Sequence, residues 1–182
     1  MFSRILARQP YHLALFDPSD KLRITGQQPK RLTFAEADRA ISALAVHFIE
    51  AGLPATSVIA VQLPNTIELV LTVLAAYRAG LIVALLPQLW RQAELTVALN
   101  RTGARAIVGM SRIDGVDHAD IAMNAAAEAF SIRHVCGFGS DLPEGMASLD
   151  IAANAANTDT SRLVIQDSRR ALHFRRQRRN AG

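Results

Sequence analysis

One structural unit occurs three times between Leu32 and Val108: an apolar helix-like stretch, a glycine, and a short β-type run. This pattern predicts helices that alternate with strands. Such alternation predicts an α/β fold, with a doubly wound, mostly parallel sheet, flanking helices and right-handed crossovers. The helix-like stretches are Phe34–Ala51, Thr66–Ala79 and Arg91–Thr102, and the β-type runs are Val58–Leu63, Leu81–Leu86 and Ala104–Val108.

The three β-type runs are expected to be neighbouring interior strands of one sheet. Val58–Leu63 has Gln62 as its only polar residue, and Leu81–Leu86 has none. A strand with one solvated face alternates apolar and polar residues, so continuous apolarity predicts that both faces are covered. The stretch Thr66–Ala79 is apolar around most of its circumference, and we expect it to be the most buried helix.

Capping signals mark the ends of these helices. Thr33 stands three residues before Glu36, which is the spacing of a capping box. Gly52 fits the left-handed position after the first helix, and Asn65 is expected to cap the second. Beyond Gly109 the pattern predicts a helix from His118 to Phe130, capped by Asp117, and then a strand at Ile132–Cys136.

Composition divides the chain into four regions. Residues 1–30 read as an irregular N-terminal arm, in which we expect a short helix around Tyr11–Phe16 and an edge strand at Lys21–Thr25. Residues 31–140 carry the α/β pattern. Residues 141–160 read as a polar linker, and residues 161–182 as an arginine-rich tail outside the fold.

The positive charge of the chain is concentrated in the tail. The net charge is +4, but residues 161–182 hold seven arginines against Asp167 alone, so the preceding residues carry about −2. A nucleic-acid-binding segment usually interleaves aromatic residues with its basic ones, and this tail offers only Phe174. We therefore expect no nucleic-acid function, and we expect that deleting the tail changes stability little.

Compartment signals favour the cytoplasm. Cys136 is the only cysteine, which excludes an internal disulfide and suits a reducing compartment. The N-terminus has no secretory apolar core. The longest uncharged stretch near the second helix, Ala79–Trp90, is shorter than the roughly 20 residues of a spanning helix, so no membrane span is expected.

Candidate chemical groups all have a simpler structural interpretation. Gly137–Ser140 lacks the later glycine and the lysine of a phosphate loop and reads as a turn after a strand. Cys136 reads as a buried, inert thiol, and His47 as a packing residue. The cluster Asp114, Asp117, His118 and Asp120 lacks metal-site spacing and reads as an Asp-Gly turn followed by a helix cap. We therefore expect no catalytic, cofactor-binding or metal-binding residue.

Three segments carry a family resemblance: LPNTIEL at Leu63–Leu69, AYRAG at Ala76–Gly80, and the run from Pro87 through AEL to TGAR, which ends at Arg105. In this order and spacing they resemble the N-terminal subdomain of the AMP-forming acyl-CoA synthetases, members of the adenylate-forming superfamily. The resemblance covers about residues 30–110. It implies a doubly wound α/β subdomain that supports the site of a ligase using ATP, Mg and CoA.

The family's catalytic segments have no counterpart here, including the Ser/Thr/Gly-rich loop that ends in Gly-x-Pro-Lys and the Thr-Gly-Asp segment. The resemblance therefore implies a fragment that is inactive alone and needs no cofactor of its own. An abrupt change to arginine-rich sequence near residue 161 is similar to out-of-frame translation. The expected partner of the fragment is the missing remainder of the enzyme, or a second copy of the fragment that binds through an exposed apolar face.

A stand-alone interaction or regulatory module without catalysis is the alternative. The DNA downstream of the stop codon separates the two hypotheses. A shifted reading frame that encodes the glycine-rich loop favours the fragment, whereas unrelated sequence favours the module.

Overall fold

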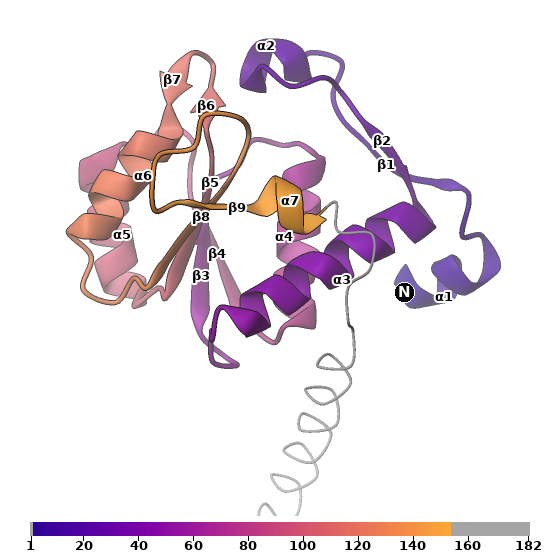
Figure 1. The fold of residues 1–182 in the computed structure, drawn as a ribbon, viewed down its shortest axis with the longest axis horizontal. Coiled ribbons are helices and arrows are strands. Elements are labelled where there is room, and N and C mark those ends of the chain that lie inside the picture. Colours follow the sequence, from indigo (N-terminus) through magenta and orange to yellow (C-terminus); the bar gives the residue numbers. More distant parts are fainter. Residues whose placement is uncertain (1, 154–182) are drawn as a thin grey trace, which may run out of the picture.

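A five-stranded parallel sheet forms the centre of the computed structural model, which describes residues 2–153 (Figure 1). The strand order is β4-β3-β5-β8-β9, and every neighbouring pair is parallel. The α/β fold with a parallel sheet is therefore confirmed. The strands are β3 (Val58–Val61), β4 (Ile82–Leu85), β5 (Ala106–Met110), β8 (His134–Phe138) and β9 (Ala147–Ser148).

Helices cover both faces of this sheet. The helices α3 (Phe34–Glu50), α4 (Ile67–Arg78) and α7 (Leu149–Ala153) pack on one face, and α5 (Gln92–Thr102) and α6 (His118–Ala127) pack on the other. Residues that alternate along β3 divide between the two layers, with Ile59 in one core and Ala60 in the other. Two apolar layers on one sheet explain why β3 and β5 are almost entirely apolar.

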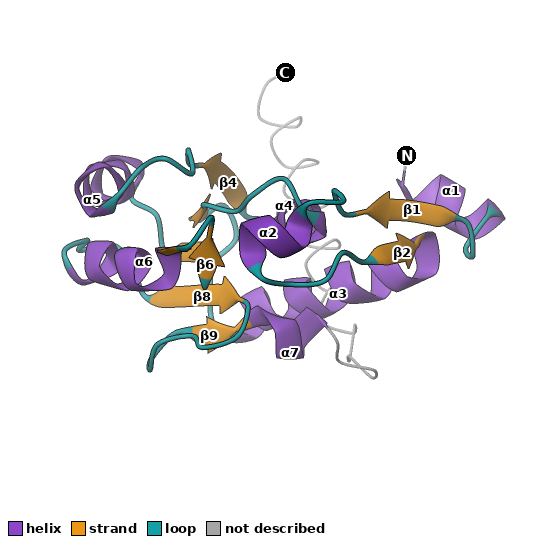
Figure 2. Ribbon diagram, turned by 90° about the horizontal axis from the view of Figure 1, so that it is seen from above, coloured by secondary structure: helices purple, strands orange, loops and turns teal. Residues whose placement is uncertain are grey.

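The N-terminal arm forms α1 (Phe2–Arg8), β1 (Leu13–Phe16), α2 (Lys21–Thr25) and β2 (Arg31–Thr33). The strands β1 and β2 pair antiparallel, and α2 lies between β6 and α4 when the molecule is seen from above (Figure 2). Both local expectations for the arm were wrong, because Tyr11–Phe16 contains a strand and Lys21–Thr25 is a helix. In a segment of about five residues, the apolar positions fit the period of a strand, 2, and the period of a helix, 3.6, almost equally well. The sequence pattern therefore could not distinguish a strand from a helix in these two segments.

The N-terminal caps of α3, α4 and α6 agree only in part with the caps expected from the sequence. The Thr33 capping box is confirmed, since the Thr33 amide donates to Glu36 Oε2 at 2.8 Å and the Glu36 amide donates to Thr33 Oγ1 at 3.3 Å. Asn65 does not cap α4, because its N-cap is Thr66. Asp117 is the N-cap residue of α6 but makes no side-chain cap bond, because Arg112 takes its carboxylate at 2.6 Å.

The strand β4 lies at the edge of the sheet, so the expectation that Leu81–Leu86 is an interior strand was wrong. Ile82 and Leu85 are 52% and 62% exposed. Nor is α4 clearly the most buried helix, since six of its twelve residues are buried against nine of seventeen in α3. The apolar outer surface of α4 is partly exposed, and Tyr77 is 55% exposed.

The second half of the fold has shorter elements than the sequence predicts. The helix α6 ends at Ala127 rather than Phe130, and β8 covers His134–Phe138 rather than Ile132–Cys136. The expected turn at Asp114 and Gly115 is confirmed, with φ values of 47° and 80°, and it joins the two strands of a small antiparallel hairpin. These strands are β6 (Arg112–Ile113) and β7 (Val116–Asp117).

Regular structure continues into the region expected to be a linker. Within residues 141–160, β9 pairs with β8 and α7 packs on α3. The interpretation of this region as a polar linker was therefore wrong up to Ala153, while the domain boundaries themselves stay a prediction. The tail at 161–182 lies outside the described residues. No helix in residues 2–153 has the length and apolarity needed to cross a membrane.

Candidate functional site

The connections of β3 define the place where a doubly wound sheet normally binds a ligand. The chain leaves β3 through α4 to reach β4 on one side, then returns through α5 to β5 on the other side. The helices that follow β3 and β5 along the chain, α4 and α6, lie on opposite faces of the sheet, and this arrangement is the one that places a crevice beyond the carboxyl ends of the two strands. Nucleotides and other anions commonly bind at such a crevice, against the N-terminus of the first helix.

Here a side chain of the N-terminal arm occupies the N-terminus of α4. Asp17 Oδ1 accepts a hydrogen bond from the Ile67 amide at 2.8 Å. A carboxylate at this position satisfies a free helix amide and interacts favourably with the positive end of the helix dipole. The arm thus supplies the negative charge that a bound phosphate would supply in a nucleotide-binding member of this fold class.

A buried ion cluster holds that carboxylate in place. Lys21 Nζ lies 2.8 Å from Asp17 Oδ2 and 2.6 Å from Glu68 Oε1, and the Lys21 side chain is fully buried. We call Asp17, Lys21 and Glu68 the arm triad. Asp17 Oδ2 also accepts from the Lys30 amide at 2.9 Å, so the triad joins the arm, α2 and α4. The N-terminus of α4 is therefore already occupied by the chain's own charges.

One oxygen of the arm triad has no partner among the described residues. Glu68 Oε2 is buried without a hydrogen bond, and Glu68 lines a cavity of about 380 Å³. Opposite charges share this cavity, because Lys30 and Arg39 line it together with Glu36 and Asp150. Asp150 Oδ2 accepts from the Gly139 amide at 2.6 Å. The lining offers charged groups of both signs but no nucleophile beside a base.

A second polar network lies directly after the carboxyl end of β3. Gln62 is buried, and its Nε2 donates to the carbonyl oxygens of Pro87 at 2.9 Å and Trp90 at 3.1 Å. Its Oε1 lies 3.3 Å from Nδ1 of His118, which is also buried. With the Gln62 amide nitrogen used as a donor, the network assigns the Nδ1 proton to a neutral His118. The contact ties β3 to the start of α6.

The stability of the fold is expected to decrease as the pH falls below about 6.5, partly because of His118. Burial lowers the pKa of His118, and the charge of Arg91 lowers it further. Between the pKa of His118 in the unfolded chain and its lower pKa in the folded chain, the unfolded chain binds a proton on His118 and the folded chain does not. The free energy of unfolding therefore decreases as the pH falls through this range. Urea unfolding at about pH 7.5 and about pH 5.5 measures this dependence.

The variant His118→Gln should show a weaker pH dependence than the wild-type chain. His47 contributes with the same sign, because burial also lowers its pKa, so some dependence should persist. The control His12→Gln alters an exposed histidine and should behave as the wild type does. A pH dependence unchanged by His118→Gln would contradict the assigned role.

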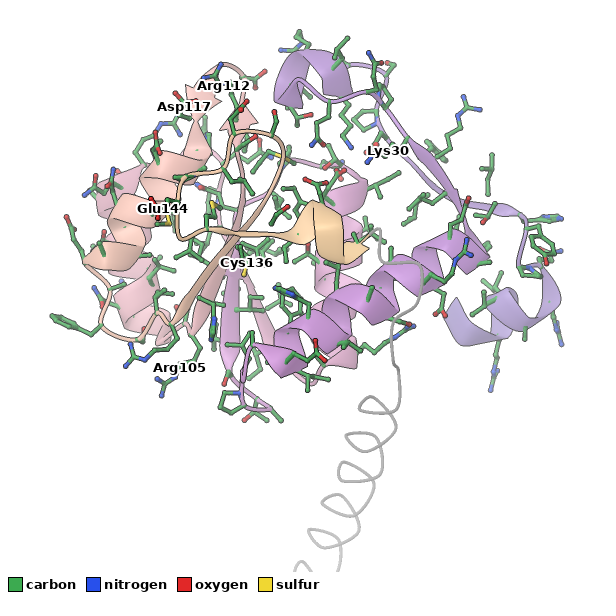
Figure 3. The ribbon with its side chains drawn as sticks, in the orientation of Figure 1. Lys30, Arg105, Arg112, Asp117, Cys136 and Glu144 are labelled. Atoms are coloured by element: carbon green, nitrogen blue, oxygen red, sulfur yellow. The ribbon has the colours of Figure 1, made fainter. Side chains whose placement is uncertain are left out.

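The other groups considered from the sequence do not form a site. Cys136 is buried, and burial raises its thiol pKa to about 11, as expected of an inert thiol (Figure 3). Asp114 pairs with Arg23 at 2.9 Å, whereas Asp117 pairs with Arg112 on the β6–β7 hairpin. His118 contacts Gln62 instead, so the cluster does not converge. Within residues 2–153, no group of three or more histidine, cysteine or acidic residues has the arrangement of a metal site.

Sequence reasoning missed the arm triad, although two signals were present. Asp17 and Lys21 have the i,i+4 spacing of an ion pair, and Glu68 stands in the first turn of an apolar helix. Because Glu68 lies on a helix that is expected to be buried, its carboxylate needs a cation as partner. The sequence does not reveal that this cation is Lys21, 47 positions away.

Comparison with known proteins gives a consistent result. A family model described as AMP-binding enzyme matches residues 2–168, a wider range than the resemblance at 30–110 and one that reaches past residue 161. No curated protein matches the sequence. Many solved structures match, and two of them, each matched with high probability, are named as a CoA synthetase and a CoA ligase.

Acetoacetyl-CoA synthetase from Streptomyces lividans is 18% identical over 86% of this chain, with a TM-score of 0.74. The anthranilate CoA ligase AuaEII, solved with anthranoyl-AMP, is 15% identical over 84% of this chain, with a TM-score of 0.71. The matches cover 25% and 26% of those chains, so this chain spans about a quarter of their length. At these identities the likeness shows the fold alone.

Proposed function

Because this chain belongs to the family of AMP-binding enzymes, we propose that it serves as the first, supporting subdomain of an AMP-forming acyl-CoA synthetase and is inactive alone. The two matched structures are a CoA synthetase and a CoA ligase, which supports an acid–thiol ligase as the parent activity. In such an enzyme ATP activates a carboxylate as its adenylate, and CoA then takes the acyl group.

The observation that carries the proposal is the occupied N-terminus of α4. Asp17 occupies the N-terminus of α4, and Lys21 with Glu68 holds it there. A phosphate at this helix end would meet a carboxylate and would have to displace a buried ion cluster, at a large cost in free energy. This supports a role in which the subdomain stabilises the enzyme while other segments bind the nucleotide.

ATP, Mg and CoA are therefore proposed for the intact enzyme and not for these residues. A triphosphate requires a loop of small residues whose amides surround the phosphates, and a cation to neutralise its charge. The sequence contains no Gly-x-Pro-Lys segment. A helix N-terminus with free amides can also bind an anion, but at the N-terminus of α4 the Ile67 amide already donates to the Asp17 carboxylate. The described residues do not fit the nucleotide, and no reaction step is assigned to them.

The purified 182-residue chain is expected to release no pyrophosphate from ATP and Mg²⁺ with any carboxylic acid in a panel. The physical reason is that adenylation joins two anions and needs preorganised positive charge at the point of attack. A coupled pyrophosphate assay measures this, with an intact acyl-CoA synthetase as the positive control. Activity that follows the chain through purification and is lost in Glu68→Gln would contradict the proposal.

The alternative of an interaction module without catalysis has one observation in its favour. The edge strand β4 exposes apolar side chains, and no strand within residues 2–153 pairs with its outer main-chain groups, as in a protein-binding edge. Pyrophosphate release is absent under both hypotheses, so binding measurements must separate them.

A further inference from the structure

The outer side of β4 has main-chain groups free to pair with another strand. The Ile82 amide donates to Ser57 O and the Leu86 amide donates to Val61 O, both in or beside β3. Main-chain groups alternate in direction along a strand, so those of Val83 and Leu85 point away from β3. No strand within residues 2–153 pairs with them, because β4 ends the sheet.

This edge lacks the features that usually prevent strand pairing. Natural edge strands carry charges, prolines or bulges, or are covered by a loop or helix. The four residues of β4 are Ile-Val-Ala-Leu, and they pair with β3 in continuous register. Ile82 and Leu85 project to opposite faces of the sheet, yet both are more than half exposed. Among the residues that the structure describes, none covers this edge fully on either face.

A groove lies between β4 and the neighbouring helix α5. Its volume is about 620 Å³, and β4 contributes Ala84 and Leu85 to its lining. The helix contributes Glu94, Val97 and Arg101, which are spaced at three and four residues and so share one face. This face presents a negative charge, an apolar centre and a positive charge in that order, and Val97 is 56% exposed.

We propose that a second copy of this chain binds here, with the two β4 strands pairing antiparallel about a twofold axis. In this arrangement Val83 and Leu85 of one copy exchange main-chain hydrogen bonds with Leu85 and Val83 of the other. The two five-stranded sheets then form one continuous sheet. Exposed apolar side chains of the edge, including Ile82 and Leu85, become covered.

The charge order on α5 is the reason for choosing a second copy as the occupant. A twofold axis perpendicular to the sheet makes the two α5 helices antiparallel, because each helix has a fixed direction relative to its own β4. Since Leu85 of β4 and Val97 in the middle of α5 line one groove, a twofold axis between the two β4 strands also turns the Val97 side of each α5 toward the other copy. Glu94 of each copy then faces Arg101 of the other. The surface is therefore complementary to itself in charge.

The mass of the full chain in solution tests the proposal, measured by light scattering and sedimentation over about a hundredfold range of concentration. The wild-type chain should show a concentration-dependent dimer. Glu94→Arg and Arg101→Glu each place like charges opposite each other, and each should weaken the dimer about tenfold at low salt. An equimolar mixture of the two variants should restore the dimer, because both cross-pairs are then of opposite charge.

The mixture distinguishes loss of pairing from loss of folding, since a misfolded variant cannot be rescued by its partner. Leu85→Lys should abolish the dimer, because an edge lysine opposes strand pairing. The matched control Phe130→Lys changes another exposed apolar residue, 89% exposed and outside the groove, and should leave the dimer intact. A monomer at all concentrations would overturn the proposal. So would a dimer insensitive to Leu85→Lys, or one that the mixture does not restore.

This inference concerns the surface of the chain and does not depend on the proposed ligase function. Its readout is molecular mass, whereas the proposed function is tested by pyrophosphate release. A monomeric chain without pyrophosphate release would contradict only the dimer.

Discussion

Replacing Lys21 by methionine is expected to lower the free energy of unfolding by about 3–5 kcal/mol. Lys21 Nζ lies between Asp17 and Glu68 at 2.8 Å and 2.6 Å, and the Lys21 side chain is fully buried. Methionine retains most of the apolar stem but leaves two buried carboxylates without a cation. Urea unfolding followed by far-UV circular dichroism measures the change.

Two further variants identify the cause of this loss. Arg23→Met removes a cation from the same helix, but the Arg23 side chain is 68% exposed, and the cost should stay below about 1 kcal/mol. The triple variant Lys21→Met, Asp17→Asn, Glu68→Gln removes all three charges and should recover part of the stability. A Lys21→Met chain as stable as Arg23→Met would show that the arm triad does not hold the arm in place.

Replacing Leu149 by alanine is expected to cost about 2–5 kcal/mol, the range for a buried leucine whose removal leaves a cavity. Leu149 begins α7, is fully buried, and belongs to the same apolar cluster as α3 and α4. This short segment follows β9, the last strand of the sheet. The measurement is again the free energy of unfolding in urea.

Leu13→Ala provides the control, because Leu13 is 58% exposed and its replacement should change stability by less than about 1 kcal/mol. Deletion of residues 161–182 should also have little effect, whereas deletion of residues 141–182 should have a large one. If the two deletions were equally tolerated, α7 would not be an integral part of the core.

The candidate site illustrates how far sequence reasoning reached. The family was correctly identified from segments such as LPNTIEL, because the order and spacing of such segments can be read directly from one sequence. The crevice beyond β3 follows from the α/β pattern, since any doubly wound sheet has one. Its contents were not predicted, because Asp17, Lys21 and Glu68 meet only after the arm folds over the sheet.

The sequence by itself determined the elements that depend on near neighbours. The alternation of helices and strands from Phe34 to Val108 and the Thr33 capping box are encoded within a few residues. The turn at Asp114 and Gly115 is encoded in the same way. Helical and extended periods differ clearly over ten or more residues, and a cap or turn involves only residues close in the chain. These features therefore need no knowledge of the rest of the fold.

Only the tertiary structure decided which apolar segments are covered and which charges are paired. Leu81–Leu86 is more continuously apolar than Val58–Leu63, yet β4 is the edge and β3 is interior. Lys21–Thr25 forms a helix whose lysine pairs with Glu68, far away in sequence. Burial is a property of the elements packed around a residue, and those elements come from distant parts of the chain. Hydropathy records the tendency of a segment to be buried, whereas the sheet order determines which neighbour is present to bury it.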